Sequence, residues 1–454
     1  MKKSFIENQN ALFAWATEAI RNPLPEPVRR RAATILADDI GAMVAGSLEP
    51  QVEKARSGFL RSQTGVKESS IFANESPKTD RYTAACANGM AITWCELDEG
   101  FRNASCHAGA YTLPALLAES EPLGKTVEEL LRALAVAYEV TTRFALALPF
   151  PSLTVHPHAA WATIGAAVGV SLARGHDAET MAAAVSGAAT MTFAGPFDTA
   201  VEGSLVRNGW TSAGAWIGMR AADWAEAGIG GGAATIHDVF AGSFRTGVKP
   251  EALADGLGER WSVANGYHKI FACCQYAHTA VEATLQLLND RGDKNLEELQ
   301  EIVVETGPGG MALTTLEPET VLAAKFSIPH AVAATTRLGT AGAKAFTFET
   351  LRDKDISALR KKVKLAPYAN LQPWPKDRPA RLVWKFRDGS EMSAISESAR
   401  GGADQPFDEQ TLLAKLSDNT SCVFPRLADG LAKVLKGEPA MSSLAWRTFL
   451  EKHL

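Results

Sequence analysis

Apolar residues recur at the three- and four-residue spacing of helices through most of the N-terminal half of the chain. Several of these segments are rich in alanine and glycine, whose small side chains let neighbouring helix backbones approach closely. A tightly packed helical domain is the expected result. The spacing predicts its helices at residues 11–20, 28–44, 52–59, 126–140, 159–172, 178–193 and 210–227.

The pattern changes near residue 260, where alternating strand-like segments first occur. Strands are predicted at 302–307 and 361–367, and a hairpin at 380–395 turns at Phe-Arg-Asp-Gly. Helices are expected at 279–288 and 321–338, and helical spacing returns in 409–416, 425–435 and 441–450. We therefore expect a mainly α protein. A large helical domain of residues 1–266 is completed by 405–454, and residues 267–404 form a smaller α+β lid domain.

Composition excludes several classes of protein. With 454 residues, a net charge of −5 and a pI near 6.1, the chain has no general attraction for nucleic acid or anionic membranes. No apolar run reaches the roughly 18 residues of a membrane span, and the N-terminus lacks the apolar core of a secretory signal. Six cysteines without CxxC spacing indicate reduced thiols, so a cytoplasmic location is expected.

One stretch concentrates proton-transfer groups, Glu96-Leu-Asp-Glu-Gly-Phe-Arg-Asn-Ala-Ser-Cys-His107. It contains the carboxylates of Glu96, Asp98 and Glu99, together with Arg102 and His107, between two apolar segments. A solvated loop is the simpler interpretation of such polarity. A loop between two buried helices that carries acid, base and cation is, however, well suited to proton chemistry.

Two further loops precede helices rich in small residues. His156-Pro-His158 opens the first, where a histidine at a helix N-terminus has a lowered pKa and can serve as a neutral base. Two ligands are a weak zinc signal, and we interpret His158 as a structural cap. Arg207 precedes the second helix and could hold a carboxylate there, although a surface ion pair is the commoner fate of a lone arginine.

Lys269 lies where the two predicted domains meet, a frequent position for small-ligand sites. A desolvated lysine there could pair with a substrate carboxylate or act as acid or base. The adjacent Cys273 and Cys274 raise an alternative thiol mechanism, with His278 or His268 as the base. No oriented triad is apparent in the sequence, and buried cysteine is the commoner state.

Together these segments resemble the MmgE/PrpD family, which includes 2-methylcitrate dehydratase, cis-aconitate decarboxylase and iminodisuccinate epimerase. The resemblance covers nearly the whole chain. It is carried by Glu96-Leu-Asp-Glu-Gly with His107-Ala-Gly-Ala, the Val155-His156-Pro loop, Lys269-Ile-Phe-Ala-Cys-Cys-Gln-Tyr-Ala-His278, and Phe326-Ser-Ile-Pro-His330.

The resemblance implies a homodimer without metal or organic cofactor, whose active site lies between a helical domain and a lid. It implies an acidic pair at Glu96 and Asp98, and histidines at His107 and His156. It also implies that Arg207 and Lys269 supply cations. The family's tyrosine falls on His330 in this chain. This chain departs from the family pattern at four positions, where Glu replaces Asp at 96, Gly replaces Thr at 100, Arg replaces Lys at 207, and His replaces Tyr at 330.

The expected activity is therefore a cofactor-independent lyase reaction, dehydration or decarboxylation, on a small di- or tricarboxylate. Proton abstraction α to a carboxylate needs a positioned base, and cations would stabilise the developing charge. Epimerisation in the same site and a non-catalytic binding protein are the alternatives. The catalytic candidates are Glu96, Asp98, His107, His156, Lys269 and His330, and the substrate-binding candidates are Arg102, Arg207, Lys269 and Gln275.

Overall fold

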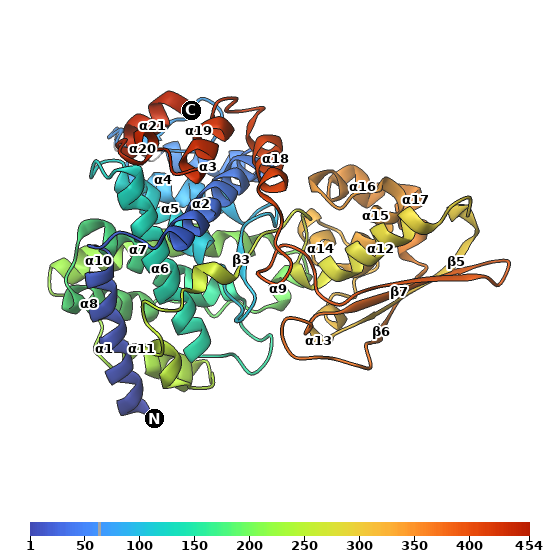
Figure 1. Ribbon diagram of the computed structural model, residues 1–454, viewed down its shortest axis with the longest axis horizontal. Coiled ribbons are helices and arrows are strands. Elements are labelled where there is room, and N and C mark those ends of the chain that lie inside the picture. Colours follow the sequence, from blue (N-terminus) through green and yellow to red (C-terminus); the bar gives the residue numbers. More distant parts are fainter. Residues whose placement is uncertain (62–64) are drawn as a thin grey trace.

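The computed structural model describes residues 1–61 and 65–454. Its larger part is a helical body formed by the N-terminal half of the chain together with the C-terminal helices, as the blue, green and red ribbons of Figure 1 show. The smaller part carries a four-stranded sheet and projects from one side of this body. The fold class predicted from the sequence, mainly α with a smaller α+β part, is confirmed.

The helical body follows the predicted periodicity closely. Its N-terminal helices are α1 (Lys2–Ala19), α2 (Glu26–Ser47), α3 (Pro50–Arg61), α4 (Arg81–Ile92), α5 (Ala108–Ser120), α6 (Val127–Ala147), α7 (Pro157–Arg174), α8 (Ala178–Ala189), α9 (Asp198–Val201), α10 (Gly209–Glu226) and α11 (Thr235–His237). Its C-terminal helices are α18 (Glu409–Thr420), α19 (Leu427–Leu435), α20 (Pro439–Ser442) and α21 (Trp446–His453). Short strands β1 (Ser69–Ser70) and β2 (Lys78–Thr79) form a separate ribbon.

Local sequence explains both the helix starts and their close packing. Thr126 and Glu129 form a complete capping box at the start of α6. Glycines let α10 and α7 touch along their length, because a Cβ at Gly218 would lie 2.4 Å from the Cβ of Ala166. The small residues on successive helices therefore bring these backbones together.

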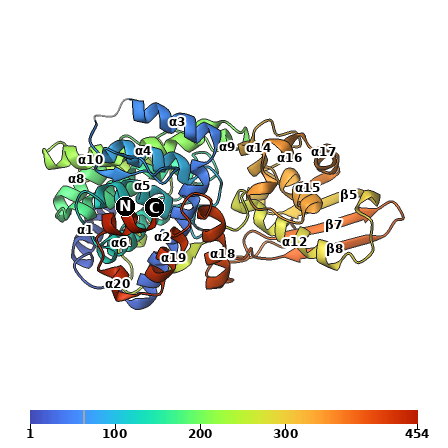
Figure 2. The same ribbon diagram turned by 90° about the horizontal axis from the view of Figure 1, so that it is seen from above.

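The smaller part contains α12 (His278–Asp290), α13 (Pro308–Met311), α14 (Val321–Lys325), α15 (Ile328–Leu338), α16 (Phe348–Arg352) and α17 (Lys354–Arg360). Its strands are β5 (Leu299–Thr306), β6 (Val363–Pro367), β7 (Ala380–Phe386) and β8 (Glu391–Ser396), in the order β6-β5-β7-β8. β5 pairs parallel with β6 and antiparallel with β7. Ile302, Leu382 and Trp384 are fully buried beneath the helices that cover one face of the sheet (Figure 2).

Two helix predictions were wrong in detail. Residues 321–338 form two helices and not one, because the chain breaks at Phe326 and the Ser327 hydroxyl caps the new start by accepting the His330 N–H. Residues 441–450 likewise divide into the end of α20 and the start of α21. In the described part of the chain, no helix combines the length and apolarity that a membrane span needs.

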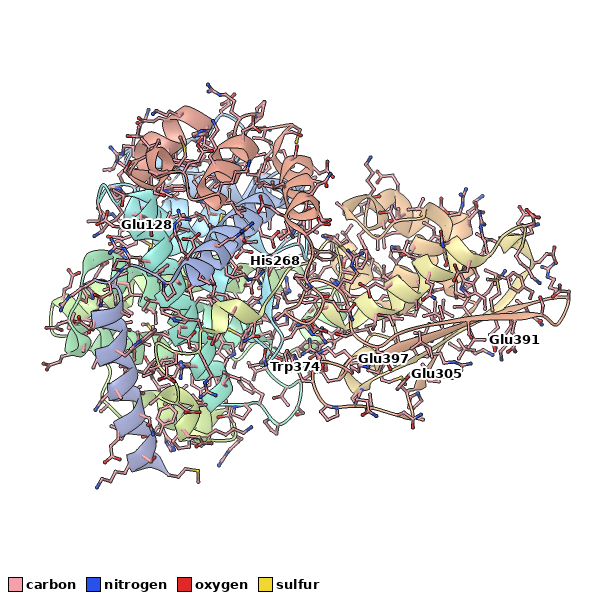
Figure 3. The ribbon with its side chains drawn as sticks, in the orientation of Figure 1. Glu128, His268, Glu305, Trp374, Glu391 and Glu397 are labelled. Carbon is pink, nitrogen blue, oxygen red and sulfur yellow. The ribbon has the colours of Figure 1, made fainter. Side chains whose placement is uncertain are left out.

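Contacts between distant segments bring the chemistry together at the boundary of the two parts. The two-residue strands β3 (Gly100–Phe101) and β4 (Gly266–Tyr267) pair antiparallel, which places Lys269 against the acidic loop. On α18, the ammonium of Lys415 donates to Asp38 Oδ1 at 2.6 Å and to the Leu97 carbonyl at 2.7 Å. His268, labelled at this boundary in Figure 3, binds the other oxygen of Asp38 at 2.8 Å.

Candidate active site

The acidic loop between α4 and α5 holds a buried ion pair. Asp98 is fully buried, and its Oδ1 accepts a hydrogen bond from Lys269 Nζ at 3.1 Å. Burial alone would raise the pKa of Asp98, but Lys269, His107 and Arg207 outweigh burial and hold the pKa well below its ordinary value. Burial likewise opposes the charge of Lys269, yet Asp98 and Glu96 raise its pKa. Both groups are therefore charged at neutral pH.

His107 stands at the N-cap of α5 and is oriented by this loop. Its Nδ1 lies 2.7 Å from Asp98 Oδ2 and 3.0 Å from the carbonyl oxygen of Glu99. Because both partners are acceptors, Nδ1 carries a proton. When the ring is neutral, its lone pair therefore lies on Nε2, as a general base requires.

The Nδ1 of His156 accepts a hydrogen bond, whereas the Nδ1 of His107 donates one. His156 caps α7, where its Nδ1 accepts the backbone N–H of His158 at 3.1 Å, while Arg207 Nε approaches its Nε2 at 3.3 Å. Burial and the charge of Arg207 lower the pKa of His156 well below its ordinary value. Because Nδ1 accepts from the helix backbone, the single proton of the neutral ring lies on Nε2, toward Arg207. His156 is a neutral imidazole, and only Nε2 is free of the helix backbone.

Glu96 connects the two cations of the cluster. Its Oε1 lies 2.5 Å from Arg207 Nη2, and its Oε2 lies 3.7 Å from Lys269 Nζ. The guanidinium of Arg207 also packs 5.4 Å from the ring centre of Phe326 on the smaller part. The cluster thus spans both parts of the molecule. We refer to Glu96, Asp98, His107, His156, Arg207 and Lys269 as the boundary cluster.

Three helix N-termini meet at the boundary cluster. His107 occupies the N-cap position of α5, His156 caps α7, and Arg207 lies in the 3-10 turn (Leu205–Asn208) that leads into α10. Helix N-termini carry a partial positive charge and favour anions. The sequence folds in this way because each of these residues directly precedes a run of helix-forming, small apolar residues.

Two protein-family models match this chain. The MmgE/PrpD N-terminal domain matches residues 10–252, and the MmgE/PrpD C-terminal domain matches residues 271–435. This chain belongs to the MmgE/PrpD family. The family predicted from the sequence motifs is therefore confirmed, and the boundary cluster lies where the two matched domains adjoin.

Curated proteins that this chain is similar to include fungal ones. The chain is 25% identical over 437 residues to the cis-aconitate decarboxylase-like protein oryM of Aspergillus oryzae, covering 89% of this chain and 88% of that protein. It is 26% identical over 286 residues to a cis-aconitate decarboxylase of Aspergillus terreus, covering 59% of this chain and 58% of that protein.

His330, which occupies the position of a family tyrosine, does not join the boundary cluster. Its Nε2 donates to the Ala345 carbonyl at 3.0 Å, and its Nδ1 lies 3.1 Å from Arg360 Nη1. Both ring nitrogens are therefore occupied within the smaller part. Burial has the largest effect on the pKa of His330, and together with the charge of Arg360 it lowers this pKa to about 4. The prediction that His330 supplies a second catalytic acid is not supported by this geometry.

The other two substrate-binding predictions also lie outside the boundary cluster. Arg102 donates to Ser398 Oγ at 3.2 Å, to the Pro375 carbonyl at 3.1 Å and to Asp377 Oδ1 at 3.2 Å, so it joins the two parts of the molecule. Gln275 begins a 3-10 turn, and its buried Oε1 has no hydrogen-bond partner among the described residues. Arg102 has a structural role in this conformation, and Gln275 keeps an unused acceptor.

The thiol alternative is not supported. Burial raises the pKa of Cys273 well above its ordinary value and that of Cys274 to about 12, so neither is a thiolate near neutral pH. His278 donates from Nε2 to the Cys273 carbonyl oxygen at 3.0 Å, and its Nδ1 binds Tyr267. His278 therefore contacts the backbone of Cys273 and does not orient a sulfur nucleophile.

Sequence reasoning missed two residues beside the boundary cluster. His158 was interpreted as the cap of α7, but His156 does the capping. The His158 ring lies 5.0 Å from that of His107 and 4.5 Å from that of His156, and its Nδ1 binds Tyr111 at 2.8 Å. Lys325 is buried and donates to the Trp94 carbonyl at 2.9 Å. In the sequence, the position of Lys325 directly before the Phe326-Ser motif could have indicated that it lies near the site.

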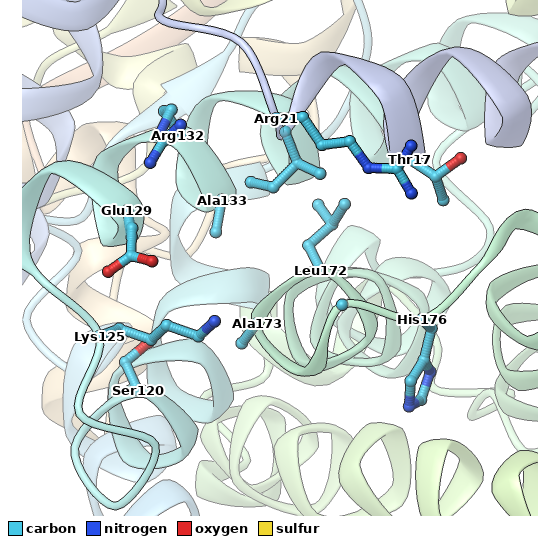
Figure 4. Close-up of a pocket in the computed structure, with 12 residues that line it drawn as sticks. Thr17, Arg21, Ser120, Lys125, Glu129, Arg132, Ala133, Leu172, Ala173 and His176 are labelled. Carbon is cyan, nitrogen blue, oxygen red and sulfur yellow. The ribbon is translucent and has the colours of Figure 1, made fainter.

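A cavity of about 400 Å³ is lined by sequence neighbours of the boundary cluster, but by none of its six residues. Its lining includes Val155 and Pro157, the neighbours of His156, together with Arg102, Tyr276 and Arg378. A second cavity of about 370 Å³, shown in Figure 4, lies among α1, α6 and α7 and shares no lining residue with the cluster. The described residues contain no group of three or more His, Cys, Asp or Glu side chains that could hold a metal ion.

Behind His107, two carboxyl groups are buried side by side. Asp39 Oδ1 accepts the Glu99 backbone N–H at 2.7 Å, and Glu99 Oε1 accepts from Tyr138 at 2.5 Å. A Cβ placed on Gly109 would lie 2.2 Å from Asp39 Oδ2 and 3.3 Å from Glu99 Oε2. Burial, and then repulsion by Asp38 and Asp98, raises the pKa of Asp39 well above its ordinary value. Burial, and then repulsion by Asp39, does the same to the pKa of Glu99.

This acid pair predicts a pH dependence of stability. The folded state holds protons that the unfolded chain releases above about pH 4, so the free energy of unfolding falls as pH rises through the folded pKa values. Glu99→Gln removes one of these titrating groups. The free energy of unfolding of the variant should therefore fall less steeply with pH than that of wild type, with a slope smaller by up to about 1.4 kcal/mol per pH unit. Denaturant unfolding between pH 5 and 8.5 tests this prediction, and parallel profiles for wild type and variant would contradict it.

Proposed function

We propose that this protein is a cofactor-independent lyase that removes a proton α to a carboxylate of a small di- or tricarboxylic acid. The single observation that carries the proposal is the position of His107 Nδ1 between two acceptors, Asp98 Oδ2 and the Glu99 carbonyl. This arrangement supports a lone pair on Nε2 of the neutral ring, while the ammonium group of Lys269 binds the other oxygen of Asp98. Membership of the MmgE/PrpD family and the names of the fungal relatives support a decarboxylase or dehydratase type of reaction.

In the proposed reaction, His107 Nε2 takes the proton and the C–H electron pair moves toward the substrate carboxylate. Lys269, next to Asp98, neutralises the charge that develops on the carboxylate oxygens. The electron pair then expels a β-hydroxyl group, which leaves as water after protonation. In the decarboxylation variant, the C–CO₂ bond supplies the electron pair, carbon dioxide leaves, and a histidine protonates the carbon. Asp98 is a positioning residue for His107 in both variants.

Epimerisation is a second candidate, and one observation favours it. His107 and His156 each offer one ring nitrogen that is not bound to the backbone, and the ring of His158 lies between them. Two such groups could remove a proton from one face of a carbon and return it on the other. An epimerase would interconvert stereoisomers and release neither water nor carbon dioxide.

A product screen tests the proposed function. The protein is incubated with citrate-like, aconitate-like, tartrate-like and aminosuccinate-like acids, and products are followed by proton NMR and carbon dioxide release. A new olefinic proton or released carbon dioxide supports the lyase. A changed diastereomer ratio alone would favour the epimerase. No conversion of any of these acids by a folded protein would contradict both functions.

His330 provides a test of the corrected site. Because its ring nitrogens bind Ala345 and Arg360, we expect His330→Ala to lose about 1–3 kcal/mol of stability and to change kcat/KM less than about threefold. Thermal unfolding and steady-state kinetics measure the two effects. A fall in kcat of more than about a hundredfold in a folded variant would return His330 to the catalytic group.

A further inference from the structure

A third cavity, of about 250 Å³, lies where the two parts of the molecule meet, and it shares no lining residue with the two cavities described above. Trp94 and Asn208 line it from the helical body, and Lys325 and Phe348 line it from the smaller part. At this point α14 lies next to α9 of the helical body, as Figures 1 and 2 show together. None of the six residues of the boundary cluster lines this cavity, so it is a candidate for a separate site.

Two buried side chains of this cavity have hydrogen-bond donors that are not used. Lys325 is 2% exposed, and its ammonium donates to the Trp94 carbonyl at 2.9 Å, which leaves further N–H groups unused. No carboxylate in the part of the chain that the structure describes pairs with this ammonium. Asn208 is 1% exposed, and its Oδ1 accepts from Arg207 Nη1 at 2.7 Å, while its Nδ2 has no partner among those residues. Buried donors without acceptors are costly, so an acceptor that enters the cavity is stabilised.

Glu49 limits the charge that this cavity accepts. It also lines the cavity, and its Oε1 lies 3.8 Å from Cys95 Sγ. The charged groups of the lining are therefore this carboxylate and the ammonium of Lys325. One ligand carboxylate is complementary to Lys325, but a second one would be repelled by Glu49, whereas a ligand hydrogen-bond donor would find an acceptor there. The volume is below the roughly 300–1,000 Å³ of pockets for drug-sized ligands, so the cavity suits a small molecule.

We propose that this cavity is a binding site for a small monocarboxylate with a hydrogen-bond donor on its α carbon, namely an α-hydroxy or α-amino acid. The carboxylate accepts from Lys325 Nζ and Asn208 Nδ2, and the α donor faces Glu49. This site is additional to the boundary cluster and does not depend on the proposed function. Because its walls come from both parts of the molecule, the ligand holds the two parts together. It also contacts Asn208, the side chain that binds Arg207.

Binding of three acids with the same carbon skeleton tests the proposal. Lactate carries a hydroxyl group on its α carbon, alanine carries an ammonium group there, and propionate carries neither. Calorimetry and thermal unfolding at fixed pH and ionic strength give the Kd and the rise in Tm for each acid. We expect lactate or alanine to bind wild type at least about tenfold more tightly than propionate, because propionate offers Glu49 no donor. The tighter of the two distinguishes an α-hydroxy from an α-amino ligand.

Asn208→Asp removes one of the proposed donors with little change in shape. The aspartate keeps an oxygen that accepts from Arg207, but it places a second carboxylate oxygen where Nδ2 was. We expect the Kd of the tighter acid to rise at least about tenfold in this variant and in Lys325→Met. Lys362→Met is the matched control, because Lys362 also donates to a backbone carbonyl, that of Leu299 at 2.5 Å, but does not line the cavity. It should leave the Kd unchanged. If Lys325→Met does not fold, Asn208→Asp decides the test.

His107→Asn separates this site from the boundary cluster. Since His107 does not line the cavity, the variant should bind the same acid with the wild-type Kd. Loss of binding in His107→Asn would place the acid in the boundary cluster and overturn the proposal of a separate site. The same conclusion would follow from a Kd that the folded Asn208 and Lys325 variants leave unchanged, or from a wild type that binds neither lactate nor alanine. Equal affinity for propionate would overturn the role of Glu49.

Discussion

His107→Asn is expected to lower kcat by about 10²- to 10⁴-fold while the protein stays folded. Asparagine keeps an N–H that can face Asp98, but it has no nitrogen lone pair to accept a substrate proton. Asp98→Asn should cause a fall of the same order, because the ring then loses the acceptor that fixes the proton on Nδ1. Steady-state kinetics on the substrate found by the product screen measure both effects.

His176→Asn is the matched control for His107. His176 also pairs with a carboxylate, Glu226 at 2.7 Å, but it lies just beyond the C-terminal end of α7 and lines the separate cavity of Figure 4. We expect its kcat to remain within about threefold of wild type. Near-normal turnover by folded His107→Asn would show that another group removes the proton, and His156 would then be the next variant to test.

Lys269→Met should have the largest effect on both stability and binding. It removes the ammonium that lies 3.1 Å from Asp98 and 3.7 Å from Glu96, and leaves a buried carboxylate without its cation. Breaking a buried pair in this way costs about 3–5 kcal/mol. We also expect at least about a hundredfold loss in kcat/KM, because the substrate carboxylate loses its counter-ion. Denaturant unfolding and kinetics measure the two losses.

Arg143→Met separates the two consequences of losing Lys269. Arg143 is a buried cation whose Nε pairs with Glu139 at 2.6 Å, so its loss should also destabilise the fold, but it should leave kcat/KM of the folded fraction unchanged. Lys269→Arg keeps the charge with a different shape and should fold with lowered kcat/KM. Wild-type kinetics in Lys269→Arg and Lys269→Met together would exclude Lys269 from substrate binding.

The strongly periodic elements could be predicted from the sequence, and the shortest ones could not. α6 was predicted because its capping box and apolar face occur together at Thr126 to Glu129. The break between α14 and α15 was missed because apolar spacing continues through Phe326, and the cap at Ser327 was overlooked. The β3–β4 ribbon has two residues in each strand, too few to produce an alternating pattern.

All six residues of the boundary cluster were candidates from the sequence, because they lie directly before helices or at the domain junction. What the sequence could not provide is the direction of each side chain. His330 matched the position of a family tyrosine, yet its ring faces Ala345 and Arg360. The roles of His156 and His158 were divided wrongly because both stand at the start of the same helix, and only the backbone geometry decides which one caps it.

Deuterium exchange tests the central claim most directly, namely that His107 in the boundary cluster removes a proton α to a carboxylate. The protein is placed in deuterium oxide with the acid found by the screen, and proton NMR follows the signal of each C–H position. We predict loss of one α C–H signal with wild type and with His330→Ala, and slowing by about 10²-fold or more with His107→Asn. Exchange at the same rate in wild type and His107→Asn, or dehydration by wild type without cleavage of any α C–H bond, would contradict the account.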